Sequence, residues 1–242
     1  MQDTTESGTE GKIVLVRHRF AGWQGGLAAM FALMLAGTPA AAESNKNNMD
    51  IAIIASLLTY TVAGVFGDRP LEKAFRPVIE KRGIGLELGR EINRSDDLEH
   101  YQLTYNWYWR DALIERQSWR LKGAWQVNVA VWHATGFVNK GNDTIYNIGI
   151  TPFLRFEPAA RLGGVTPYAE FGIGPQLISE TSIGIKQKST AFQFGSNYGF
   201  GIAFGDKDEF RVGYRYLHVS NADIKKPNNA LDFHNVFFEY RY

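Results

Sequence analysis

The sequence predicts an all-β fold, an eight-stranded antiparallel transmembrane β-barrel, and three observations support this prediction. First, from residue 82 onward, short segments alternate apolar side chains with polar or small ones and are separated by turn-forming residues. Second, the polar positions of these segments are rich in glycine and charge, as suits the interior of a narrow barrel. Third, the chain ends on the aromatic Tyr242, with apolar residues at alternate positions before it.

The alternation can be followed segment by segment. In the first segment, Ile84, Leu86 and Leu88 share one face, because successive side chains of a strand point to opposite sides. The same alternation recurs in seven further segments, at 101–109, 125–131, 146–155, 169–174, 192–204, 210–216 and 235–242. Eight strands of this kind are enough to close a small barrel.

The polar face of these strands distinguishes a membrane barrel from a soluble one. A soluble barrel or sandwich encloses an apolar core, whereas an outer-membrane barrel turns its apolar face to lipid. Aromatic residues at strand ends, Trp107, Trp109, Trp125 and Tyr242, suit the interfacial girdles of such a barrel. The polar set is predicted to fill the lumen and comprises Glu87, Gln102, Asn106, Gln126, Asn128, Arg155, Glu170, Gln193, Arg211, Arg215, Glu239 and Arg241.

The N-terminal region has the order of a secretory signal. Basic residues at 17–19 precede an apolar run at 25–35 and small residues at 40–42, which predicts cleavage after Ala42. The run is shorter than the ~20 residues of a spanning helix, so a membrane anchor is the weaker alternative. The predicted organisation is a leader and signal peptide (1–42), an N-terminal extension of unclear structure (43–81) and the barrel (82–242).

Composition excludes several function classes. The formal net charge is +1, with both signs interspersed, which gives no support for nucleic-acid binding. The chain has no cysteine, which rules out thiol nucleophiles and cysteine-type zinc sites. His100, His133 and His234 lack clustered partners in the sequence, so no metal is expected.

Hydrogen-bonding residues interrupt the apolar face at one place. Continuing the parity of the seventh segment puts His218 and Ser220 on the lipid-facing side, and extending the eighth segment backward puts Asp232 and His234 there. If the hairpin register pairs His218 with Asp232, the imidazole can reach both the carboxylate and the nearby hydroxyl. Such a set supplies a nucleophile, a base and an orienting acid. The alternative is that these residues merely occupy the wet headgroup zone.

The segment HVSNADIKKPNNALD, residues 218–232, with YRY before it, resembles the lipid A 3-O-deacylase (PagL) family. The resemblance is strongest over 210–242 and implies that His218 is the base, Ser220 the nucleophile and Asp232 the acid. It also implies Asn221 and Asn228, or nearby backbone N–H groups, as candidates for oxyanion stabilisation or substrate binding. Members often carry glutamate where this chain has Asp232 and glycine where it has Asp223.

The resemblance implies a serine carboxylic-ester hydrolase that needs no cofactor or metal. Its substrate would be lipid A of lipopolysaccharide in the bacterial outer membrane, from which it would remove an ester-linked 3-hydroxyacyl chain, at the 3-O position. A barrel with both termini in the periplasm would place the 221–231 loop outside the cell. Two alternatives remain open, a non-catalytic barrel of structural or adhesin type and a lipid A acyltransferase, as does homodimer formation.

Overall fold

The computed structural model describes residues 77–91, 97–135 and 142–242. The predicted leader and residues 43–76 lie outside this part of the chain, and the first strand begins three residues before the predicted start of the barrel, at Ile79. No helix in the described ranges is long and apolar enough to cross a membrane. The strands are β1 Ile79–Glu91, β2 Leu98–Trp109, β3 Ile114–Glu115, β4 Trp119–Ala134, β5 Thr144–Pro158, β6 Thr166–Ile178, β7 Ser182–Ile183, β8 Lys186–Gln187, β9 Phe192–Phe204, β10 Phe210–Ser220 and β11 Leu231–Arg241.

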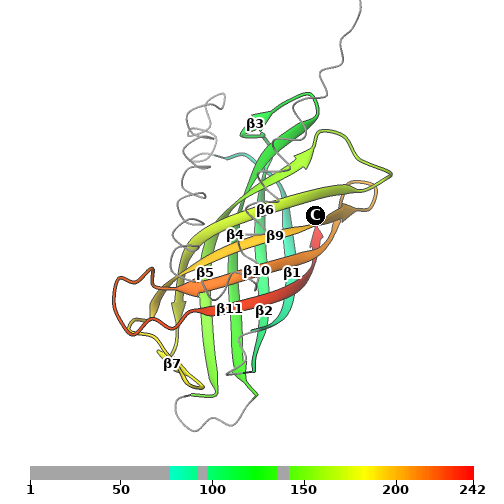
Figure 1. The fold of residues 1–242 in the computed structure, drawn as a ribbon. Coiled ribbons are helices and arrows are strands. Elements are labelled where there is room, and N and C mark those ends of the chain that lie inside the picture. The colour runs from blue at the N-terminus through cyan, green and yellow to red at the C-terminus, as the bar shows by residue number, and fades with distance from the viewer. Residues whose placement is uncertain (1–76, 92–96, 136–141) are drawn as a thin grey trace, which may run out of the picture.

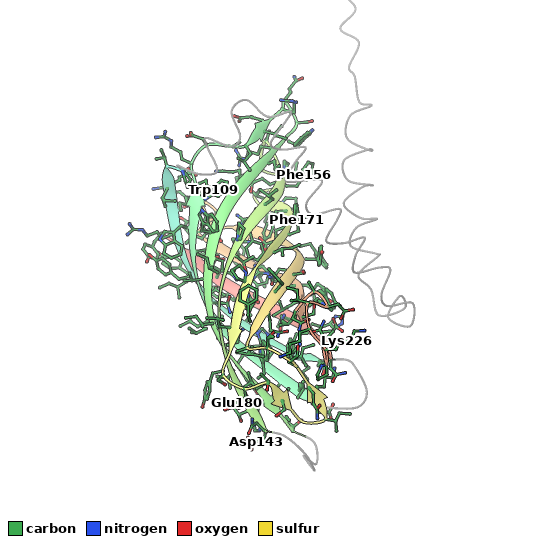
Figure 2. All side chains as sticks on the ribbon, turned by 90° about the vertical axis from the view of Figure 1, so that its left-hand side faces the viewer. Trp109, Asp143, Phe156, Phe171, Glu180 and Lys226 are labelled. Atoms are coloured by element: carbon green, nitrogen blue, oxygen red, sulfur yellow. The ribbon has the colours of Figure 1, made fainter. Side chains whose placement is uncertain are left out.

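The long strands form one closed antiparallel barrel, which confirms the predicted fold (Figure 1). Their order is β2-β1-β11-β10-β9-β6-β5-β4, and pairing of β2 with β4 closes the circle. The connections at 179–191 and 221–230 lie at one end of the barrel, which we call the loop end. The chain terminates at the opposite end, where Tyr242 pairs with Arg82. In Figure 2, Glu180 and Lys226 lie toward the loop end and Trp109 toward the other.

The outer wall is apolar, as the alternation predicts. The exposed fraction of Leu103 is 52% and that of Val236 is 62%. A continuous belt of apolar side chains exposed to this extent would be unfavourable in water. Trp109 differs from the other aromatic residues predicted for the girdles, because only 3% of its surface is exposed. Its ring lies over Gly123, where a Cβ atom would collide with it, and packs with Leu113 of the β2–β4 connection.

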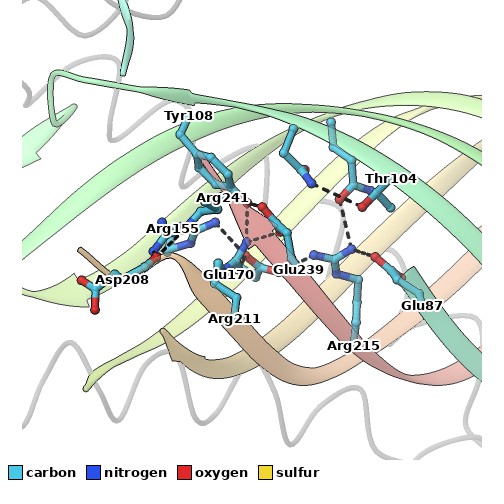
Figure 3. A network of polar contacts seen from close by, with 12 residues as sticks. Glu87, Thr104, Tyr108, Arg155, Glu170, Asp208, Arg211, Arg215, Glu239 and Arg241 are labelled. Carbon is cyan, nitrogen blue, oxygen red and sulfur yellow. Dashed lines mark hydrogen bonds and ion pairs between the residues drawn. The ribbon is translucent and has the colours of Figure 1, made fainter. Parts of the chain in front are cut away.

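The lumen is filled by an ion-pair network (Figure 3), and every residue of the predicted polar face is buried. Glu170 of β6 lies at its centre and accepts hydrogen bonds from Arg211 at 2.6 Å, Arg155 at 3.4 Å and Arg215. Arg211 also donates to Glu239 at 2.9 Å. Because these five charges each have an opposite partner, the ion pairs offset the large cost of burying them.

At the loop end, the interior changes from polar to apolar. Inward positions that continue the polar rows carry Leu98, Trp132, Ile145, Leu217 and Phe233, all nearly fully buried and in one cluster. The sequence pattern predicts only polar and small residues in the lumen, so this apolar cluster was not expected from it. The cluster packs against the lumen side of the β10–β11 hairpin.

Candidate active site

The predicted site residues lie on the β10–β11 hairpin, where they alternate with members of the apolar cluster. Leu217, Val219 and Phe233 point inward and are at most 4% exposed. Since side chains alternate along a strand, His218 and Asp232 must then project from the outer wall. The inward packing therefore holds the outward side chains in a fixed direction.

His218 and Asp232 are directly paired in the β10–β11 register. The distance between His218 Nδ1 and Asp232 Oδ1 is 2.6 Å, which is short, as hydrogen bonds to a charged group are. Both groups are largely withdrawn from solvent, with side-chain exposed fractions of 8% for His218 and 18% for Asp232. The carboxylate is thus placed to hold the proton of the imidazole on Nδ1 and to leave Nε2 as the acceptor.

Ser220 projects from the same face of β10, two residues beyond His218, and is 3% exposed. Its Oγ atom accepts a long hydrogen bond from the backbone N–H of Ala222, at 3.4 Å. His218 Nε2 is buried and has no hydrogen-bond partner among the residues that the structure describes. The structure therefore brings His218 and Asp232 into hydrogen-bond contact, but in the described ranges no hydrogen bond joins His218 Nε2 to Ser220 Oγ.

Asn221 and Asn228 make their hydrogen bonds within the loops of the loop end. The Nδ2 atom of Asn221 donates to Ser189 Oγ at 2.9 Å and to the Lys225 carbonyl at 2.7 Å. Asn228 Oδ1 accepts from the Asn221 backbone N–H at 3.0 Å, and its Nδ2 donates to Asp223 Oδ1 at 3.1 Å. The two side chains fix the shape of the loop that follows Ser220.

That loop turns through two left-handed residues, Ala222 at φ 54° and Asp223 at φ 56°. Aspartate tolerates this region better than most residues, and its hydrogen bond from Asn228 helps to hold it there. The conformation directs the Ala222 N–H toward Ser220 Oγ. A backbone donor therefore lies beside the serine hydroxyl even though residue 223 is not glycine.

Two further outward residues adjoin the site and were missed by the sequence analysis. Ser196 of β9 is paired directly with His218 on the side away from Asp232, and it is 4% exposed. Tyr216 donates its hydroxyl proton to Asp232 Oδ1 at 2.6 Å. Ser196 could have been noticed, since it interrupts the apolar face of the 192–204 segment, whereas Tyr216 continues the expected aromatic pattern.

A second hairpin, formed by β7 and β8, binds the 221–230 loop. Gln187 exchanges backbone and side-chain hydrogen bonds with Asn229, at 3.0 Å to the Gln187 carbonyl and 2.9 Å from its N–H. Lys186 forms a buried ion pair with Glu91 and donates to the Ala230 carbonyl at 3.1 Å. The β7–β8 hairpin thus helps to fix the 221–230 loop beside the site, although the two segments are distant in the sequence.

Lys188, which follows β8, reaches the base of the same loop. Its Nζ atom donates to the Val219 carbonyl at 2.9 Å and to the Asn229 carbonyl at 2.8 Å, which joins the end of β10 to the 221–230 loop. Burial, together with the charge of Lys186, lowers the pKa of Lys188 from its ordinary value of 10.5 to about 7. Asp232 and Glu91 oppose this shift.

The lowered pKa of Lys188 predicts a pH-dependent stability. Between pH 7 and 10.5 the unfolded chain retains the lysine proton that the folded protein has released, so the free energy of unfolding should rise with pH. In Lys188→Met this contribution should vanish, whereas Lys226→Met, at an exposed position of the 221–230 loop, should keep it. Urea unfolding in detergent at pH 6, 8 and 10 measures the difference, and parallel curves for wild type and Lys188→Met would contradict the prediction.

Fold and site together define a small membrane β-barrel with a hydroxyl, an imidazole and a carboxylate gathered on its outer wall. The model of the lipid A 3-O-deacylase (PagL) family matches residues 99–241, a range that includes all three groups. The chain belongs to the lipid A 3-O-deacylase (PagL) family, and it is an outer-membrane protein.

Individual relatives agree with this assignment. The chain is 32% identical over 148 residues to the lipid A deacylase PagL of Bordetella bronchiseptica, covering 60% of this chain and 78% of the relative. Identity to the lipid A deacylase PagL of Pseudomonas aeruginosa is 27% over 139 residues, or 57% and 76% of the two chains. The crystal structure of the outer membrane enzyme PagL superposes with a TM-score of 0.56 at 23% identity, covering 65% of this chain and 98% of that one, which supports the fold.

Proposed function

We propose that the protein is a lipid A deacylase that hydrolyses an ester-linked 3-hydroxyacyl chain, at the 3-O position, by a Ser-His-Asp mechanism. The observation that supports this most directly is the 2.6 Å contact between His218 and Asp232 on the outer wall, beside Ser220. The substrate is taken from the family and its relatives, and the mechanism from the chemistry of the three side chains.

In the proposed reaction, Ser220 Oγ attacks the ester carbonyl while His218 Nε2 accepts the hydroxyl proton. The tetrahedral intermediate collapses when the bond to the sugar oxygen breaks, and His218 returns the proton to that oxygen as the alcohol leaves. Water, deprotonated by the same nitrogen, then attacks the acyl-serine ester, and His218 returns the proton to Ser220 Oγ as the fatty acid is released. Asp232 holds the imidazole through Nδ1 and stabilises the cation formed in each step.

The negative charge on the carbonyl oxygen needs a donor near Ser220. The backbone N–H of Ala222, 3.4 Å from Ser220 Oγ, is the group best placed to supply it. In this scheme Asn221 and Asn228 would act by fixing the shape of the loop. Asn228 accepts a hydrogen bond from the Asn221 backbone, and Asn221 donates one to the Lys225 carbonyl. A backbone donor fixed in this way needs little rearrangement during the reaction.

The position of the site suits a lipid substrate. The three side chains lie on the wall that faces the bilayer, and at the loop end, which lies in the outer leaflet if both termini are periplasmic. The outer leaflet is where lipopolysaccharide is found. An acyl chain could reach Ser220 sideways, without entering the lumen, which the ion-pair network fills.

The test is to express the full chain in a bacterium whose lipid A carries 3-O-linked hydroxyacyl chains and to examine its lipid A by mass spectrometry. The proposal predicts the loss of one hydroxyacyl chain and the release of a free 3-hydroxy fatty acid. Folding of the inserted barrel is checked by its heat-dependent mobility in gels. Unchanged lipid A would favour a non-catalytic barrel, and transfer of the chain to a second lipid would favour an acyltransferase.

A further inference from the structure

A tyrosine outside the three proposed groups makes the other hydrogen bond to the acid. Asp232 Oδ1 accepts from Tyr216 Oη at 2.6 Å, the same distance as from His218 Nδ1. We propose that Tyr216 is a positioning residue for the deacylation reaction, acting through Asp232 on His218. This inference rests on the proposed function and deepens it.

The barrel register explains how Tyr216 reaches the acid. In the β10–β11 pair, Tyr216 lies opposite His234 and His218 lies opposite Asp232, so Tyr216 and Asp232 are diagonal neighbours on the outer face. Diagonal partners are about 7 to 8 Å apart at their Cα atoms, a span that the long tyrosine side chain crosses. A shorter side chain at position 216 could not place a donor on the carboxylate.

The surroundings of Tyr216 hold its ring in place. Its centroid lies 5.3 Å from that of His234, with an interplanar angle of 62°, an edge-to-face arrangement. The hydroxyl of Tyr216 is therefore aimed at Asp232 by packing and does not have to be ordered when substrate arrives.

The effect on the reaction follows from the charge that develops at His218. Asp232 is largely shielded from water, and a shielded carboxylate depends on its hydrogen-bond donors to remain ionised and correctly oriented. With two donors on Oδ1, the carboxylate keeps one rotational position in which that oxygen faces the imidazole. When Tyr216 is removed, the carboxylate is free to turn away and the imidazolium loses part of its stabilisation.

Tyr216→Phe should therefore lower kcat about tenfold without changing KM, because it removes one hydrogen bond to a charged group and leaves the ring in place. The matched control is Tyr214→Phe, which removes a hydroxyl from the same face of the same strand but one that contacts His234 instead of Asp232. This control should keep wild-type kcat and KM. Both variants are assayed as full-length barrels in detergent micelles with purified lipid A.

A double-mutant cycle separates positioning from a general loss of structure. In an Asp232→Ala background, Tyr216→Phe should cost less than twofold, since the group through which it acts is absent. If Tyr216→Phe has no effect in the wild-type background, or reduces activity equally in both backgrounds, the proposal is overturned.

Nitrogen NMR of histidine-labelled, refolded barrel gives a readout that needs no activity. Tyr216→Phe should shift the ring nitrogens of His218, assigned by their loss in His218→Asn, while Tyr214→Phe should shift those of His234 only. If His218 does not respond, the positioning role fails whatever the enzyme does. If it responds but wild-type protein leaves lipid A intact, the proposed function fails while the contact to Asp232 stands.

Discussion

Ser220→Ala is expected to abolish deacylation, with a fall in rate of about 10⁴-fold or more, while the barrel folds and inserts normally. The loss is large because the nucleophile is removed outright, and such residues act as a unit with their base. Stability should change little, since the only hydrogen bond recorded for the hydroxyl among the described residues is the long one from Ala222. Mass spectrometry of lipid A from cells expressing the variant, beside wild type, measures the effect.

Ser196→Ala is the matched comparison for Ser220→Ala. Ser196 is also a buried outward serine and is paired directly with His218, so Ser196→Ala removes a hydroxyl group beside the same imidazole. The proposed mechanism predicts that Ser196→Ala retains deacylation while Ser220→Ala loses it. The reverse result would identify Ser196 as the nucleophile, and activity in both single variants would remove the serine mechanism.

Glu170→Gln is expected to destabilise the barrel by about 3 to 5 kcal/mol, the usual cost of leaving buried charges without their partner. Glu170 accepts hydrogen bonds from Arg155, Arg211 and Arg215, all buried in the lumen (Figure 3). Removing its charge leaves these arginines with Glu87 and Glu239 alone as acidic partners in the network. Urea unfolding of refolded protein, followed by tryptophan fluorescence, gives the free energy of unfolding.

Glu157→Gln provides the control for this prediction. Glu157 pairs with Arg120 at 2.7 Å, but the Arg120 side chain is 30% exposed, so water can compensate for the lost partner. Its cost should be at most about 1 kcal/mol. Equal effects of the two substitutions would mean that the lumen network contributes no more to stability than a partly exposed pair.

Much of the barrel could be predicted because a strand repeats every two residues. Alternation of apolar and polar residues, as in Leu86, Glu87 and Leu88 of β1, located all eight long strands. It also showed which face of each strand turns to the bilayer. The same parity placed His218 and Ser220 on the outer wall. Where the prediction fell short, as at Trp109, the outcome depended on Gly123 of another strand, which leaves room for the indole ring.

Contacts between distant loops were beyond this kind of reasoning. Lys186 and Lys188 lie in a short polar segment of the kind expected for an exposed turn. Their spacing does not indicate that their amines bind backbone carbonyls of the β10–β11 hairpin and its loop. Tyr216 likewise fits the aromatic pattern of a lipid-facing strand. Its contact with Asp232 exists only because the β10–β11 register makes them diagonal neighbours.

The barrel, the apolar outer wall, the polar lumen and the side on which the three proposed site residues lie could all be predicted from the sequence, because they follow from a local two-residue period. Tertiary structure decided the 2.6 Å contact of His218 with Asp232, the second donor from Tyr216 and the hold of the β7–β8 hairpin on the 221–230 loop. These depend on strand register and on loops meeting in space, which a local period does not specify.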